Sequence, residues 1–240
     1  MKVMVIGASD TLGTYLPDPS QGTFPILARE LPGRLHGEAV EVSHLRFYSH
    51  AKDAARFASA QVLEQAPDVV VLAAHSMAFG TPSVGARLIH LFGWSIGRSM
   101  ERRIWAFDRK ARTSRLAAAV RKPARRLAHR TVGVATYASV EDTIRDYGET
   151  ISLLARIEDL QVIVLGTFQP RRDGDTGPGI QLNAGLAKVA AAHRLTWIDR
   201  QAIVTGLGAA AFQPNGLYSS PLVHRAVADA VLDAIARQRA

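Results

Sequence analysis

The chain has 240 residues, of which 48% are apolar and 21% are charged, so it is long and apolar enough for an α/β domain with a large core. It contains no cysteine, which excludes a disulfide framework and a thiolate metal site. No apolar run approaches the ~20 residues that cross a bilayer, and the first residues do not read as a signal peptide, so we expect a cytoplasmic protein.

The net charge of +8 is concentrated in one segment. Residues 84–130 hold thirteen lysines and arginines against two acidic residues, a local charge of +11, which leaves −3 for the rest of the chain. The basicity therefore belongs to one region and not to the whole fold.

Apolar runs and amphipathic stretches alternate along the chain. Strands are predicted at residues 3–6, 39–42, 69–72, 162–166 and 196–199. Helices are predicted at residues 23–31, 51–65, 140–157, 182–193 and 223–237, the first ended by Pro32 and Gly33, and residues 200–220 are predicted to form a loop. This alternation favours an α/β fold with a mostly parallel five-stranded sheet covered by helices on both faces.

The basic segment interrupts this alternation. Ile96, Met100, Ile104 and Phe107 recur at helical spacing, and a second stretch around residues 116–127 is also predicted to be helical. We therefore expect a single domain over residues 1–240 with a basic helical insertion at about 84–130.

The first thirteen residues, MKVMVIGASDTLG, place a serine directly after a buried strand. Ligands of open α/β sheets collect at that edge. One interpretation is the dinucleotide-binding turn of an NAD(P)-binding atypical short-chain reductase, in which Gly7 and Gly13 fit. It is the least favoured, because Asp10 stands at the middle glycine position, where its carboxylate would repel phosphates, and prolines at 17, 19 and 25 interrupt the helix that should hold the anion.

The same opening resembles the first block of the SGNH (GDSL-type) hydrolases, with Gly7, Ala8 and Ser9 in place of Gly-Asp-Ser. Residues 67–72 (PDVVVL) are similar to the strand that enters the third block of that family. Residues 215–218 (NGLY), with 224–226 (HRA) opening a helix, resemble the last block. The resemblance implies the SGNH (flavodoxin-like) three-layer sandwich and acyl-ester chemistry on a serine, with no cofactor or metal.

Carried over position by position, the resemblance makes Ser9 the nucleophile. The position of the histidine base is occupied by Tyr218, and that of the aspartate that orients it by Asn215. His75 stands where the family has the asparagine that donates to the oxyanion, and Ser49 is the small residue nearest to the second-block glycine. The Asp-x-x-His block is thus replaced by Asn-x-x-Tyr. A tyrosine with a pKa near ~10 is a poor base toward a serine at neutral pH.

Two histidines offer a replacement for the missing base. His75 follows the third strand, where its ring can donate to an oxyanion or accept the proton of Ser9. His224 lies six residues beyond the usual base position, at the start of the last helix, where a structural role is the simpler interpretation. Tyr218 and Asn215 are interpreted as lining a binding pocket.

We therefore predict a serine ester hydrolase or acyltransferase with a degenerate triad, acting on a small-molecule acyl ester or lipid-like substrate. The alternative is a catalytically inactive SGNH-fold protein that binds an acyl or carbohydrate ligand. The basic segment at 84–130 is interpreted as a lid, with contact to an anionic or membrane surface as an alternative. Nucleic-acid binding is the least favoured, because no known motif for it is present.

Overall fold

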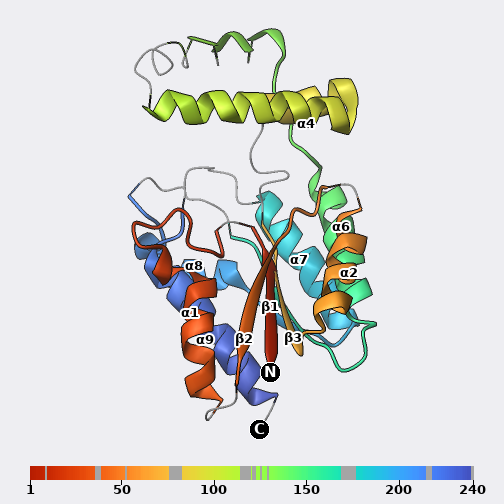
Figure 1. Cartoon of the computed structure of the whole chain (residues 1–240), viewed down its shortest axis with the longest axis vertical. Coiled ribbons are helices and arrows are strands. Elements are labelled where there is room, and N and C mark those ends of the chain that lie inside the picture. Colours follow the sequence, from red (N-terminus) through yellow and green to blue (C-terminus); the bar gives the residue numbers. More distant parts are fainter. Residues whose placement is uncertain are drawn as a thin grey trace. The chain divides into compact units, whose positions relative to one another are not determined.

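The structure is a computed structural model (Figure 1). It describes residues 1–8, 10–35, 39–51, 53–75, 83–113, 120, 123–124, 126–128, 130–168, 177–214 and 218–238. The chain divides into two compact units: the first comprises Met1–Ser76 and Val140–Ala240, and the second comprises Met77–Ser139.

The first unit is built on a five-stranded parallel sheet, which confirms the predicted α/β class. Its strands are β1 (Lys2–Gly7), β2 (Glu41–Arg46), β3 (Val69–Ala73), β4 (Gln161–Leu165) and β5 (Thr196–Ile198), in the order β2-β1-β3-β4-β5. Val5 of β1 pairs with Val71 of β3, which pairs with Ile163 of β4. The central strands are buried on both faces, as expected for continuous apolar runs in a parallel sheet.

Helices cover both faces of this sheet (Figure 1). On one side α1 (Thr23–Arg34) packs on α9 (Pro221–Arg237), next to α8 (Arg200–Leu207). On the other side α6 (Val140–Leu154) packs between α2 (Ala54–Gln65) and α7 (Gly177–Ala192). Because the chain leaves β1 toward β2 and then returns to β3 on its other side, the sheet order reverses beside β1, the position at which such sheets bind ligands.

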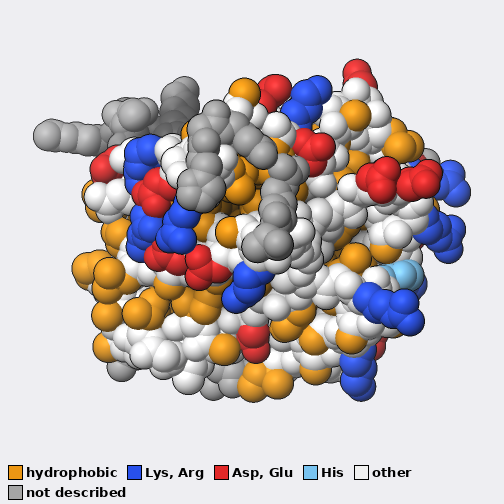
Figure 2. All heavy atoms as spheres, turned by 90° about the horizontal axis from the view of Figure 1, so that it is seen from below, with side chains coloured by type: hydrophobic (Ala, Val, Ile, Leu, Met, Phe, Trp, Pro, Cys, Tyr) orange, Lys and Arg blue, Asp and Glu red, His pale blue; other side chains and the backbone are white. Residues whose placement is uncertain are grey.

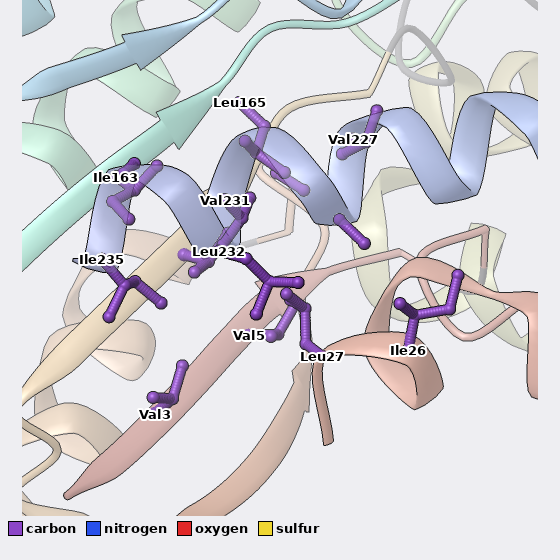
Figure 3. Close-up of a cluster of buried hydrophobic side chains, with 14 of the residues drawn as sticks. Val3, Val5, Ile26, Leu27, Ile163, Leu165, Val227, Val231, Leu232 and Ile235 are labelled. Atoms are coloured by element: carbon purple, nitrogen blue, oxygen red, sulfur yellow. The ribbon is translucent and has the colours of Figure 1, made fainter. Parts of the chain in front are cut away.

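The core between α9, α1 and the sheet is apolar (Figure 3). Residues of α9 four positions apart form one helical stripe that faces β1 and β4, and α1 adds side chains beside them. Figure 3 labels ten of these side chains, none more than 3% exposed: Val3, Val5, Ile26, Leu27, Ile163, Leu165, Val227, Val231, Leu232 and Ile235.

Two elements differ in extent from the sequence prediction. The first helix continues past Pro32 and Gly33 to Arg34, since a proline in the final turn removes only one backbone donor while Leu31 beside it is fully buried. The second strand begins at Glu41, later than predicted, and runs on to Arg46.

The stretch predicted as a loop after β5 contains two helical elements. These are α8 and the 3-10 helix η3 (Gly208–Ala211). The carboxylate of Asp199 accepts from the backbone N–H groups of Gln201 (2.9 Å) and Ala202 (3.2 Å), so α8 has an N-cap of the ordinary kind. Arg200 is the first residue of this helix.

The second unit contains the predicted basic helix as α4 (Val84–Thr113). The helix breaks at Gly93, whose φ of 76° favours glycine. Glu101 is buried and accepts hydrogen bonds from Arg98 and from the hydroxyl of Tyr137. Burial and the bond to Glu101 raise the pKa of Tyr137 to about 12.

Of the second predicted helix, residues 126–128 are helical, and Leu116 lies outside the described residues. In the part of the chain that the structure describes, no helix combines the length and apolar character that crossing a bilayer requires.

Candidate active site

The predicted site lies at the carboxyl ends of the strands of the first unit, around the segment that follows β1. Ser9 itself lies outside the described residues, but both of its neighbours in the chain are described. The carbonyl of Ala8 accepts from the backbone N–H (3.2 Å) and the hydroxyl (2.7 Å) of Thr11, which closes a tight turn. The carboxylate of Asp10 takes part in an ion pair at this edge.

Asp10 forms an ion pair with Arg200. The Arg200 Nη2 donates to Asp10 Oδ2 at 3.0 Å, and its Nη1 donates to the carbonyl of Ala74 at 3.4 Å. The guanidinium lies 4.8 Å from the centre of the Phe168 ring, in a cation–π arrangement. Arg200 is thus held by residues that follow β1, β3 and β4.

The pair keeps Asp10 ionised. Burial alone raises the pKa of this carboxyl, but the charge and hydrogen bond of Arg200 outweigh burial and leave the pKa below its ordinary value. The charges of His75 and His224 contribute in the same direction as Arg200. Both histidines are therefore close enough to Asp10 to interact with its charge, which brings two of the predicted site residues around the residue next to Ser9.

His75 is buried directly after β3. Its backbone N–H donates to the hydroxyl of Tyr147 at 3.2 Å, and its ring packs edge-on against Tyr48 and Tyr147, with centroid distances of 5.7 and 6.2 Å. Burial lowers the pKa of His75, while the charge of Asp10 and a hydrogen bond to the backbone of Phe47 act against that shift. The ring is consequently neutral at neutral pH.

His224 lies in the first turn of α9 and is 4% exposed. Its Nδ1 accepts from the backbone N–H of Thr23 at 3.3 Å and lies 3.0 Å from the Thr23 hydroxyl. Since a backbone N–H can only donate, Nδ1 carries the lone pair, and the proton of the neutral ring is on Nε2. Burial, with the charge of Arg200, lowers the pKa of His224 to about 4.

Tyr218 and His224 line the same small hollow at this edge. Its volume is about 30 Å³, room for a water molecule and little more. The ring of Tyr218 stacks on that of Tyr15, with centroids 4.2 Å apart and planes 7° apart. Gln213 fixes this wall by donating to the carbonyls of Tyr15 and Ser219, both at 3.0 Å. The walls of the hollow are formed by Asp10, Tyr15, Phe168, Gln213, Tyr218, Ser219 and His224.

Asn215 lies outside the described residues, so the predicted Asn-x-x-Tyr block is described only at Tyr218. Ser49, the residue nearest to the second-block glycine, is buried after β2, beside the hydroxyl of Tyr147. Within the described ranges, no group of three His, Cys, Asp or Glu side chains is placed to hold a metal ion. In a dinucleotide-binding turn a helix follows the first strand directly, and its N-terminus holds the phosphates. Here the α-helix after β1 begins at Thr23, and the ionised carboxylate of Asp10, which would repel phosphates, lies between the two.

Sequence reasoning missed the roles of three residues. Asp10 was considered only as an obstacle to phosphate binding, and neither Arg200 nor Thr23 was singled out as a site residue. A signal for the ion pair was present, since a carboxylate follows the first strand and an arginine follows the fifth, and parallel strands end at the same edge. Nothing in the sequence indicated that Thr23 faces a ring 201 residues away.

Comparison with known proteins gives structural matches alone: no family model matches the chain, and no curated protein does. The acetyl xylan esterase AlAXEase has 14% identity and a TM-score of 0.57, over 98% of this chain and 100% of the esterase. The psychrotrophic esterase EstA from Pseudoalteromonas sp. has 9% identity and a TM-score of 0.55, over 99% and 97% of the two chains.

A member of the lipolytic protein G-D-S-L family from Veillonella parvula DSM 2008 has 13% identity and a TM-score of 0.54, over 97% of each chain. At these identities the likeness concerns the fold, which agrees with the strand order and the helices on both faces of the sheet. The chain therefore has the three-layer α/β fold of the SGNH (GDSL-type) hydrolases.

Proposed function

We propose that the chain is a serine ester hydrolase or acyltransferase in which Ser9 is the nucleophile and His75 is the base. One observation carries the proposal: Asp10, the residue after Ser9, lines one hollow with His224 and is paired with Arg200, which also binds the carbonyl of Ala74, the neighbour of His75. Esterases with the same fold make acyl-ester chemistry the first reaction class to test. The substrate class is a small-molecule acyl ester or a lipid-like ester.

His75 has the properties of a base. Its ring hydrogen-bonds to the backbone of Phe47, so one ring nitrogen carries a proton held in place and the other carries a lone pair. Phe47 would thereby orient the ring as a carboxylate does in an ordinary triad. The negative charge of Asp10 raises the pKa of His75, which means that it stabilises the imidazolium formed when the ring takes a proton.

His224 has the properties of a hydrogen-bond donor. Its Nδ1 is occupied by the N–H of Thr23, and its protonated Nε2 is left to donate. In the proposed reaction the Ser9 hydroxyl attacks the ester carbonyl while His75 takes its proton. The Nε2–H of His224 then stabilises the oxyanion, and His75 returns the proton to the departing alcohol. Water or a second alcohol repeats these steps on the acyl-enzyme.

A second candidate is a ligand-binding protein without turnover. It is favoured by Tyr218, which stands at the family's base position and stacks on Tyr15. A stacked pair of tyrosines offers an apolar surface with polar edges, suited to an acyl or carbohydrate ligand.

Labelling by a fluorophosphonate probe, together with hydrolysis of p-nitrophenyl esters, separates the two candidates. Ser9→Ala should abolish both signals. His75→Gln should lower kcat by about 10²- to 10⁴-fold, the range for loss of a general base. His224→Gln should lower kcat by about 10²- to 10³-fold, the range for loss of one oxyanion donor.

His193→Gln is the matched control, because His193 is exposed and its ring bonds only to Ser152 (3.0 Å) among the described residues. Labelling and turnover should stay at the level of the unmodified protein in this variant. Absent labelling and absent turnover in the unmodified protein would exclude the hydrolase and favour the binding protein.

A further inference from the structure

The helix α4 exposes an apolar stripe. Ile96 is 57% exposed, Met100 39% and Ile104 38%. These residues are four positions apart, so their side chains follow one another along the same side of the helix. Leu91 and Phe92, just before the break at Gly93, are also half exposed. Contiguous exposed apolar side chains of this kind mark an interaction surface.

Basic side chains border this stripe. At about 100° per residue, Arg103 lies about 20° from Ile96 around the helix, at the edge of the stripe, and Arg102 lies about 120° from Ile96, beyond Arg103. Both arginines are exposed, and no described carboxylate forms an ion pair with either. Glu101, the acidic residue of this helix whose side chain is described, is 2% exposed and is bonded to Arg98 and Tyr137. The exposed surface of α4 is therefore apolar on one side and cationic beside it.

This distribution is local to residues 84–130, which carry a net charge of +11 while the rest of the chain carries −3. Figure 2 shows one face of the molecule, on which acidic, basic and apolar side chains are interspersed. General solubility does not require thirteen basic residues in one segment, so a partner of complementary charge is indicated.

We propose that α4 binds the surface of an anionic lipid bilayer. The helix would lie in the plane of the interface, with Ile96, Met100 and Ile104 toward the acyl chains, Arg103 at the lipid phosphates, and Arg102 adding positive charge on the side that faces water. A nucleic acid satisfies the arginines equally well but leaves the apolar stripe in water, so the bilayer accounts for more of the surface. The inference does not depend on the proposed esterase activity.

Co-sedimentation with vesicles tests the proposal on the whole chain. The unmodified protein should sediment with vesicles that contain phosphatidylglycerol, not with vesicles of phosphatidylcholine alone, and high salt should weaken the binding. Arg102→Glu/Arg103→Glu should weaken it by about 30-fold or more, from roughly fivefold per basic residue lost. Ile96→Ser/Met100→Ser should weaken it by about tenfold.

Two controls make the result specific. Arg156→Glu/Lys188→Glu changes the net charge by the same amount at exposed positions of the first unit, and it should bind markedly better than the α4 charge variant. Ser9→Ala should bind as the unmodified protein does, which separates this inference from the proposed function. Far-ultraviolet circular dichroism checks that each variant is folded.

Three outcomes would overturn the inference. They are equal binding to both kinds of vesicle, equal weakening by the charge control and by the α4 variant, and failure to bind anionic vesicles at all. In the last case, tight binding of a DNA or RNA oligonucleotide that Ile96→Ser/Met100→Ser leaves unchanged would assign the surface to nucleic acid.

Discussion

Replacing Asp10 by asparagine removes the carboxylate from a guanidinium that has almost no access to water. The side chain of Arg200 is 4% exposed and that of Asp10 is 23% exposed. The two partners of the ion pair therefore differ in how well water can compensate for the loss of the other.

This difference sets the expected magnitudes. Asp10→Asn leaves a buried, unpaired guanidinium, and breaking a buried pair in this way costs about 3–5 kcal/mol of the free energy of unfolding. The amide oxygen of asparagine still accepts a hydrogen bond, which favours the lower end, about 3 kcal/mol. Arg200→Met keeps an unbranched stem against Phe168 and leaves a carboxylate that water reaches, so we expect about 1–2 kcal/mol.

Urea unfolding with linear extrapolation measures both effects and the double variant Asp10→Asn/Arg200→Met. Once the guanidinium is gone, the carboxylate has lost its partner, so the double variant should be about as stable as Arg200→Met alone. The coupling between the two sites should then equal the cost of Asp10→Asn alone, about 3 kcal/mol. If the two single losses add in the double variant, or if Asp10→Asn costs less than Arg200→Met, the interpretation of the pair is wrong.

Two further predictions concern acid and the loop after β1. The pKa of His224 is about 4 in the folded protein and that of an unfolded histidine is about 6.5, so the unfolded chain takes up the proton first, and the free energy of unfolding should fall by about 2–3 kcal/mol between pH 7 and about pH 4.5. His224→Gln should remove the contribution of His224 to this fall, and a slope from His75, whose pKa is also lowered, should remain. An unchanged pH profile in that variant contradicts the assignment. Gly13→Ala should destabilise the protein, because Gly13 has a φ of 69° and an added Cβ would lie 2.7 Å from the carbonyl oxygen of Pro19. Gly33→Ala in α1 is its matched control, since a Cβ there meets nothing within 4 Å. A helix gains about 0.5–1 kcal/mol of stability from this change. The midpoint temperature of thermal unfolding should therefore fall for Gly13→Ala and rise for Gly33→Ala.

The fold could be predicted from the sequence because its strands are short apolar runs separated by amphipathic helices. Residues 69–72 are uniformly apolar, and the structure places them in a central strand buried on both faces. The errors fell where local signals compete. Pro32 predicts the end of the helix, but Leu31 beside it is buried and the helix continues to Arg34. Asp199 was predicted to end the fifth strand, but in the structure it is the N-cap of α8.

The site was predictable only in part. Strand ends were enough to bring His75 to the edge that also holds the residue after Ser9, because parallel strands share that edge. The ends of the strands also place Asp10 and Arg200 at this edge. That the two side chains form an ion pair across 190 residues cannot be told from one sequence. The protonation of His224 depends on a backbone N–H at the start of α1, and no sequence pattern carries that information.

The bond between Thr23 and His224 joins the first turn of one helix to the first turn of another across most of the chain. A proton added to Nδ1 would place two donors face to face and remove the acceptor that the opening of α1 uses. Acid should therefore weaken the contact between α1 and α9 when it adds a positive charge to the His224 ring. Any loss of activity at low pH would then have two causes: weaker packing of α1 against α9, and protonation of His224.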